Sequence, residues 1–175
     1  MRRAHGNCEA MPQSLITLEA LAALLPRQAR LLGVDLGTKT IGLALSDVER
    51  RVATPLLTIA RTKFTKDAEK LIAEIERFDI AALIVGLPLN MDGSEGPRAQ
   101  ATRAFLRNLT PLCSRPSALW DERLSTAAVN RSLIEQDVSR AKRAAVVDRM
   151  AAAYILQGAL DRLASLGKNM RLEEG

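Results

Sequence analysis

Histidine, cysteine and aromatic residues are scarce in this chain, and each scarcity excludes a class of chemistry. The one histidine, His5, lies in an unpatterned N-terminal stretch, so we expect no serine–histidine or cysteine–histidine mechanism in the core. The two cysteines, Cys8 and Cys113, form no CxxC pair, which excludes a zinc or redox motif of that kind. Acid–base or metal chemistry would therefore rest on carboxylates, lysines or hydroxyls.

Long apolar runs are also missing. No run approaches the roughly 20 residues that a membrane span requires, and the N-terminus lacks the apolar stretch of a signal peptide. We therefore expect a cytoplasmic protein. The 175 residues suit one domain, with 47% hydrophobic and 26% charged residues as in globular proteins. A net charge of +5 favours an anionic partner, nucleic acid first.

The apolar pattern predicts strands and helices in alternation. A short helix at 14–25 ends before Pro26, and three strands at 30–37, 40–47 and 51–61 form an antiparallel meander. After these we expect a helix at 65–78, a strand at 80–88, a helix at 97–109, a short strand running into a loop at 117–124 and helices at 126–136 and 141–166. The strand at 80–88 is almost wholly apolar, as in parallel sheets covered on both faces. The order predicts an α/β fold of three layers, a mixed central sheet flanked by helices. We place this domain at 30–168, after an extension at 1–29 and before a tail at 169–175.

Two carboxylates lie at or near predicted strands. Asp35 interrupts the apolar run LLGVDLG, where a buried charge needs a partner or a metal ion. The alternative is that Asp35 caps a turn at Gly37. Glu122 ends a short strand, and ligands of open α/β sheets bind at strand ends. The alternative is a solvated loop glutamate.

A third carboxylate, Asp148, falls among alanines on the apolar face of the last helix. The alternative is an ordinary structural partner, such as Arg162 or a buried hydroxyl. Together, three carboxylates form the oxygen donor set that Mg²⁺ or Mn²⁺ prefers. Two such ions can support the in-line hydrolysis of a phosphodiester, by activating water and stabilising the departing 3′ oxygen. We therefore expect Asp35, Glu122 and Asp148 to be catalytic metal ligands.

Basic residues that could contact a substrate concentrate between Pro97 and Arg149, with ten Lys or Arg against five Asp or Glu. Such side chains suit phosphate contacts, although a solvated basic face is the alternative. Arg123 could instead pair with a neighbouring acid, and Asn90, Asp92 and Ser94 could fix their own loop. Trp120 and Tyr154 are expected to pack in the core. The candidate substrate contacts are Lys39, Asn90, Arg98, Arg123, Arg140, Lys142 and Arg143.

Four segments resemble, in order, the motifs of the YqgF family, also called RuvX: GVDLGTKTIGLALSD, IVGLPLNMDGSEG, WDERLSTAAV and VVDRMAAAYILQGALD. The resemblance implies an RNase H-like fold and a nuclease that resolves Holliday junctions or matures the 5′ end of pre-16S rRNA. It places the family's acidic residues on Asp35, Glu122 and Asp148, and it implies that the NMDGS loop borders the active site. Ala144 and Ala145 stand where related sequences often carry lysines.

Two other functions are compatible with these residues. DLGTKT also resembles the first phosphate motif of sugar kinases and actin-like ATPases, which clamp nucleotide between two domains, whereas this length allows one. The chain could also be a non-catalytic nucleic-acid or ribosome-associated module. Under either function we expect a monomer or a homodimer. Our sequence-based hypothesis is a metal-dependent endonuclease that acts on structured RNA or branched DNA.

Overall fold

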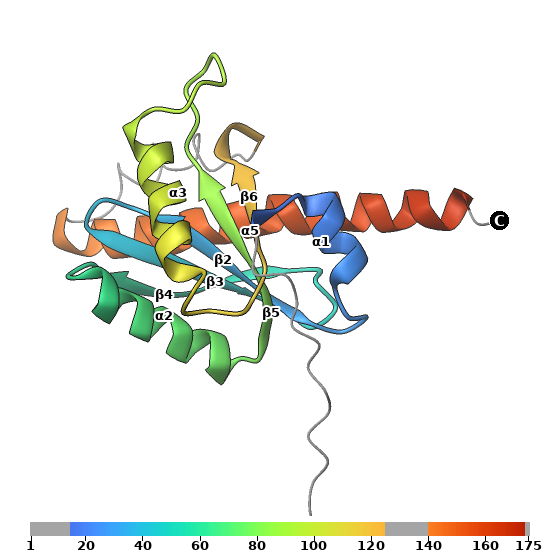
Figure 1. The fold of residues 1–175 in the computed structure, drawn as a ribbon, viewed down its shortest axis with the longest axis horizontal. Helices are drawn as coiled ribbons and strands as arrows, with labels where there is room; N and C mark the ends of the chain where they lie inside the picture. Colours follow the sequence, from blue (N-terminus) through green and yellow to red (C-terminus); the bar gives the residue numbers. More distant parts are fainter. Residues whose placement is uncertain (1–14, 125–139, 174–175) are drawn as a thin grey trace, which may run out of the picture.

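A computed structural model gives the fold of the chain (Figure 1). It describes residues 15–124 and 140–173, and the side chains of residues 140–146 and 169–173 lie outside the description. In this part of the chain a six-stranded sheet has the order β1-β6-β5-β2-β3-β4. The strands are β1 (Leu15–Ile16), β2 (Arg30–Leu36), β3 (Thr40–Ser46), β4 (Ala53–Ala60), β5 (Ile80–Leu87) and β6 (Ser117–Asp121).

The sheet is mixed, as the sequence predicts. The meander β2-β3-β4 is antiparallel, whereas β5 pairs in parallel with β2 and with β6, and β6 pairs in parallel with β1. The helices are α1 (Leu18–Leu24), α2 (Phe64–Arg77), α3 (Pro97–Leu109) and α5 (Arg140–Glu173), with a 3-10 turn η1 (Glu122–Leu124) after β6. Figure 1 shows α5 crossing one face of the sheet while α2 and α3 cover the other.

Strand alternation divides the core between these two faces. Leu32, Val34 and Leu36 of β2 lie in the cluster with α2 and α3. Leu31 lies in the cluster with α1 and α5, so Asp35, four residues further along the same strand, also points to the α5 face. The candidate site around Asp35 therefore lies on the α5 face of the sheet.

Small residues let α5 lie unusually close to the sheet. A Cβ at Gly33 of β2 would lie 2.7 Å from the carbonyl oxygen of Ala152. Ala152, Ala159 and Leu156 are fully buried on the helix side of this contact. The alanine-rich sequence of the helix is therefore explained by its contact with the sheet, since larger side chains would hold the two apart.

Several predicted boundaries need correction. The helix predicted at 14–25 begins only at Leu18, because Leu15 and Ile16 pair with β6 and Thr17 caps the helix by accepting from the N–H of Ala20 (3.1 Å). The short strand predicted to run into a loop over 117–124 is β6 followed by η1, and the last helix runs to Glu173 instead of 166. The helix predicted at 126–136 lies outside the described residues.

In the described ranges, we find no helix that is both long and apolar enough to cross a membrane.

Candidate active site

Asp35 lies inside β2 and is only 1% exposed. Its register partner on β3 is Gly42. On the other side, β2 pairs with β5 as far as Val34 and Val85, so the next residue of β5, Gly86, adjoins Asp35. Asp35 is therefore flanked within the sheet by two positions that have no side chain.

Asp148 occupies the space over the first of these positions. A Cβ at Gly42 would overlap the carbonyl group of Asp148, so the α5 backbone rests directly on β3 beside Asp35. The Asp148 carboxylate is partly exposed, and its Oδ2 accepts a hydrogen bond from the Thr40 hydroxyl. The structural partner considered for Asp148 is therefore a hydroxyl. Arg162 pairs instead with Glu19 (3.5 Å).

Glu122 occupies the space over the second position. A Cβ at Gly86 would lie 2.7 Å from Oε1 of Glu122, so this carboxylate lies over β5 rather than extending into solvent. Glu122 begins η1 directly after β6, and it is partly buried. The strand end thus delivers the carboxylate to the α5 face, on the far side of Asp35 from Asp148.

Another buried carboxylate, Asp67 at the start of α2, shows the contrast with an ordinary structural acid. It is 2% exposed and accepts from the N–H of Thr62 (3.0 Å) and from the hydroxyl of the same residue (3.1 Å). Asp67 lies against the opposite core cluster, among α2 residues such as Ala68 and Leu71. Its burial is compensated by these hydrogen bonds from Thr62, just before α2, and it takes no part in the candidate site.

The three carboxylates provide only oxygen donors. In the described part of the chain, no three Asp, Glu, His or Cys side chains are gathered into a ready metal cage. Mg²⁺ commonly takes one or two carboxylates and completes its shell with water and substrate phosphate. The oxygen donors, and the placement of Asp148 and Glu122 over the two glycines that flank Asp35, fit an open site of that kind.

The turn between β2 and β3 borders this site. Its closing hydrogen bond runs from the N–H of Gly37 to the carbonyl of Thr40 (2.9 Å). Arg61, the residue after β4, stabilises this turn with two hydrogen bonds. Its guanidinium donates to the Gly37 carbonyl (2.7 Å), and its backbone N–H donates to the Lys39 carbonyl (2.9 Å). Lys39 itself is exposed. Sequence reasoning missed the role of Arg61, and no local pattern singles it out.

Arg123, a predicted substrate contact, is an ion-pair partner in this structure. It binds Asp121 through Nη2 (2.7 Å) and Nε (3.0 Å), as the pairing alternative anticipates. The guanidinium lowers the pKa of the Asp121 carboxyl, and Asp121 in turn raises the pKa of Arg123. Nη1 of Arg123 also donates to the Met91 carbonyl (3.3 Å), which ties η1 to the loop after β5.

That loop is held mainly by its own polar groups. Asn90 donates to the Ser94 hydroxyl (2.9 Å), and the Ser94 hydroxyl donates to Asp92 (2.6 Å). The hydrogen bonds that Asp92 accepts from the hydroxyl and the N–H of Ser94 lower the pKa of Asp92. Figure 1 shows the loop projecting beyond the sheet, and Met91 at its tip is 92% exposed. Asn90 therefore has the loop-fixing role that the sequence left open, and its contact with substrate stays a prediction.

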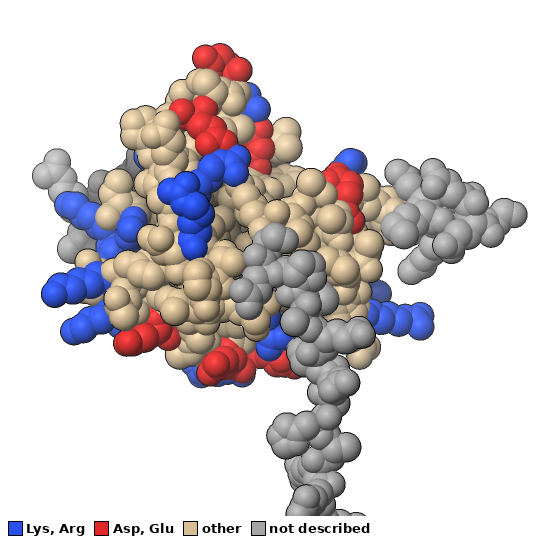
Figure 2. Space-filling view, in the orientation of Figure 1, with Lys and Arg blue, Asp and Glu red and all other residues tan. Residues whose placement is uncertain are grey.

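Basic side chains lie over α3, beside the acidic side chains of the loop that follows β5 (Figure 2). Arg98 and Arg107 are exposed, whereas Arg103 is bound to Glu95 (2.5 Å). This ion pair raises the pKa of Arg103 and lowers that of Glu95. The side chains of Arg140, Lys142 and Arg143, at the start of α5, lie outside the described residues.

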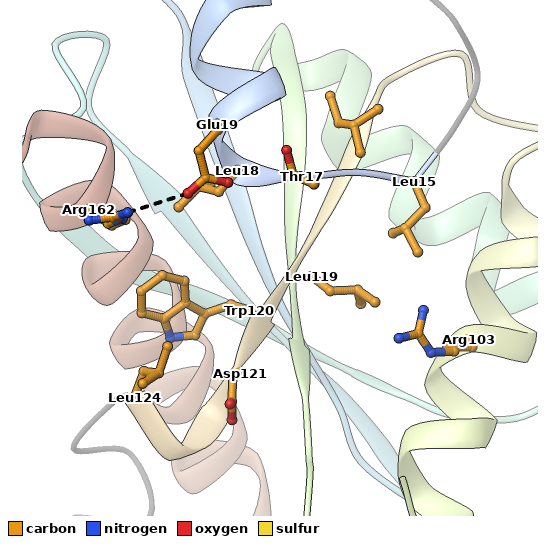
Figure 3. Close-up of a pocket in the computed structure, with 11 residues that line it drawn as sticks. Leu15, Thr17, Leu18, Glu19, Arg103, Leu119, Trp120, Asp121, Leu124 and Arg162 are labelled. Atoms are coloured by element: carbon orange, nitrogen blue, oxygen red, sulfur yellow. Dashed lines mark ion pairs between the residues drawn. The ribbon is translucent and has the colours of Figure 1, made fainter. Parts of the chain in front are cut away.

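A cavity of about 740 Å³ opens at the β1–β6 edge, and its lining includes Asp121, just before the η1 segment that carries Glu122, and Leu124, at the end of that segment (Figure 3). The Glu19–Arg162 ion pair links α1 to α5 beside it. Trp120 lines the cavity but is only 9% exposed and packs against Gly158, which confirms its place in the core. No predicted site residue lines this cavity.

Comparisons with known proteins point to one family. The sequence profile described as "RuvX: Holliday junction resolvase" matches residues 29–162. A protein of Beijerinckia indica subsp. indica is 69% identical over 154 residues, covering 88% of this chain and 93% of its own length. One from Methylocella silvestris is 75% identical over 138 residues, covering 79% and 85%. Both carry the name "Putative pre-16S rRNA nuclease".

Among solved structures, Thermus thermophilus RuvC in complex with a Holliday junction substrate matches with a TM-score of 0.51. The match covers 78% of this chain and 96% of that one, at 13% sequence identity. At this identity the likeness shows the fold, and it confirms the RNase H-like class expected from the sequence.

Proposed function

The chain belongs to the RuvX family, and from that premise we propose that it is a metal-dependent endonuclease whose reaction is the processing of the 5′ end of pre-16S rRNA. One observation carries the assignment of the site. Asp35, buried on β2, has a glycine on each side in the sheet, and Asp148 and Glu122 lie against those two glycines. The proposed place of action is the cytoplasm.

Asp35, Glu122 and Asp148 would hold one or two Mg²⁺ or Mn²⁺ ions. Carboxylates that approach one another repel, so a bound cation would offset the cost of drawing these three together. When bound, the metal would supply activation of water and stabilisation of charge on the phosphate.

The protein's own groups orient the reactants. Thr40 fixes one carboxylate oxygen of Asp148, and Gly42 sets the depth at which that carboxylate meets the sheet. Gly86 leaves the space that Glu122 occupies. Orientation of this kind lowers the barrier because the reacting atoms need no further ordering.

Substrate contacts are proposed on both sides of the carboxylates. Lys39 lies on the exposed turn held by Arg61, and Arg98 is exposed on α3. Arg123 already donates to Asp121 through Nε and Nη2 and to the Met91 carbonyl through Nη1, so a phosphate contact would compete with these bonds. Arg140, Lys142, Arg143 and Asn90 complete the proposed set of phosphate contacts.

The substrate is proposed to be RNA because the two relatives above carry the name of a pre-16S rRNA nuclease. The family description favours a second candidate, the Holliday junction. A junction resolvase cuts two strands symmetrically, which suits a homodimer, whereas a monomer can trim an RNA end.

The deciding experiment offers a pre-16S rRNA 5′ fragment and a four-way DNA junction to the protein with Mn²⁺. We expect cleavage of the RNA by the wild type and by Asp79→Asn, but only background cleavage by Asp35→Asn. Asp79 is a matched control because its side chain is 94% exposed and lies before β5, away from the site.

Cleavage of the junction alone would replace the RNA substrate by branched DNA. Binding of either nucleic acid without cleavage, by folded protein with metal present, would support a non-catalytic module instead. Equal cleavage by Asp35→Asn and wild type would remove Asp35 from the site.

A further inference from the structure

A second groove, of about 970 Å³, lies at the opposite end of the β2–β3 hairpin from the carboxylates. Its walls are the end of α1 and the following segment, the turn between β3 and β4, and the C-terminal part of α5. Four cations and two carboxylates line it, namely Arg27, Arg50, Arg51, Lys168, Glu49 and Asp161. None of these residues belongs to the candidate active site.

Arg50 gives this groove a fixed positive charge. Its backbone has φ 58°, and its guanidinium donates to the carbonyls of Pro26 (2.8 Å), Arg27 (3.4 Å) and Ala29 (3.4 Å). Burial lowers the pKa of Arg50, although nearby Asp47 opposes the shift. The side chain therefore pins the β3–β4 turn to the segment before β2 and holds both walls of the groove in place.

The other cations are at the rim. Arg27 and Lys168 are exposed, on opposite walls. Arg51 pairs with Glu49 (3.1 Å), but both side chains are largely exposed, so the pair is weak and can open to another anion. Asp161 accepts from the Gln157 side chain (3.0 Å). The lining thus carries a surplus of two positive charges.

Helix α5 connects the groove to the candidate active site, because its C-terminal part lines the groove and Asp148 lies nearer its N-terminal end. With a helical rise of about 1.5 Å per residue, Asp161 lies about 20 Å and Lys168 about 30 Å from Asp148 along the axis. At about 3.4 Å per base pair in B-form DNA, this separation corresponds to about six to nine base pairs, and it corresponds to somewhat more in an A-form RNA duplex, whose rise per base pair is smaller.

We propose that this groove, the distal groove, binds the phosphate backbone of a duplex arm of the same nucleic acid whose scissile bond lies at Asp35. The inference rests on the proposed function, and it adds a second anchoring point that favours substrates with a duplex of about ten base pairs or more beside the cleavage site. Phosphate contacts of this kind supply affinity and register without reading sequence.

The test measures binding by fluorescence anisotropy, in an Asp35→Asn background so that the substrate stays intact. The probes are RNA hairpins with stems of about 5 and about 15 base pairs and the same single-stranded flank. The distal-groove variant is Arg27→Glu with Lys168→Glu. The matched control is Lys66→Glu with Lys70→Glu, two exposed lysines of α2 on the other side of the sheet, which make the same change of net charge.

For the long hairpin we expect the distal-groove variant to lose about tenfold in affinity and about two units of salt slope. For the short hairpin, we expect the same affinity with the distal-groove variant, the control variant and the parent protein. An equal loss in the control variant, or an equal loss on both hairpins, would overturn the proposal, as would no loss at all. Wild-type cleavage is measured separately, so absent cleavage with stem-dependent binding would count against the proposed function and not against the distal groove.

Discussion

The Thr40–Asp148 hydrogen bond connects the turn after β2 to the helix that lies across the sheet. Thr40 belongs to β3 and Asp148 to α5, so the bond fixes a carboxylate to an element other than its own. The hydroxyl donates to one carboxylate oxygen, which leaves the other oxygen available to a cation. A bond of this kind usually acts on ligand orientation rather than on folding.

Thr40→Val should therefore weaken metal use more than stability. Valine keeps the shape and removes the donor, so we expect the apparent Mn²⁺ affinity in the cleavage assay to fall about 10- to 100-fold. Thr54→Val, at an exposed position of β4, is the matched control and should leave the metal titration unchanged. Identical titrations for Thr40→Val and the wild type would show that the bond has no orienting role.

At the scale of elements, the contact between α5 and β3 is a contact of backbones. Gly42 makes it, and neither backbone can move aside without separating the helix from the sheet. At the other end of the same helix, Gly167 has no atom within 4 Å of the position that a Cβ would take. The two glycines therefore offer opposite outcomes for the same substitution.

Gly42→Ala should lower the free energy of unfolding by about 3 kcal/mol, since overpacking here cannot be relieved by a side-chain movement. Gly167→Ala should raise it by about 1 kcal/mol, because alanine favours an exposed helix. Urea denaturation of both variants measures the difference. A stable Gly42→Ala protein would mean that α5 does not rest on β3.

The turn between β3 and β4 carries a pH-dependent contribution. Asp47 accepts from the N–H groups of Val52 (2.9 Å) and Arg51 (2.7 Å), and the bond from Val52 is the main cause of its lowered pKa. A folded-state pKa below the unfolded value means that the stabilisation is complete above the unfolded pKa and is lost as the pH falls through the folded one.

Asp47→Ala should therefore cost about 1 kcal/mol of unfolding free energy at neutral pH. Against the wild type, this cost should shrink as the pH is lowered below the ordinary aspartate range, near 4. Urea unfolding at a series of pH values checks it. A difference that stays constant with pH would contradict the link to carboxylate ionisation.

For the whole molecule, the sequence predicted most of the described elements, and it singled out three acidic residues as candidate ligands because a buried strand, an apolar helix face and a strand end each make a carboxylate conspicuous. It did not predict β1, since two residues carry no periodicity. It also could not give the roles of Thr40, Arg61 and Gly86. Their contacts join segments that are far apart in the chain, and only the register of the sheet brings these together.

The sequence predicts that residues 1–29 are an extension outside the domain. Whether α1, within this segment, unfolds cooperatively with the domain can be tested. Leu21 of α1 is fully buried in the cluster with α5, whereas Leu24 of the same helix is 39% exposed. Leu21→Ala should lower the free energy of unfolding by about 3 kcal/mol, and Leu24→Ala by less than about 1 kcal/mol. Thermal unfolding measures both, and equal small effects would leave α1 outside the folded domain.

The close fit of α5 on the sheet also sets the mutational tolerance of the molecule. Cβ atoms at Gly33, Gly42, Gly86 and Gly158 would each meet an occupied position on or under this helix. Every other amino acid has a Cβ, so any missense change in these four codons adds an atom where there is no room. In a saturation library, these four positions should therefore be intolerant of every substitution, and two of them, Gly42 and Gly86, lie on either side of Asp35 in the sheet.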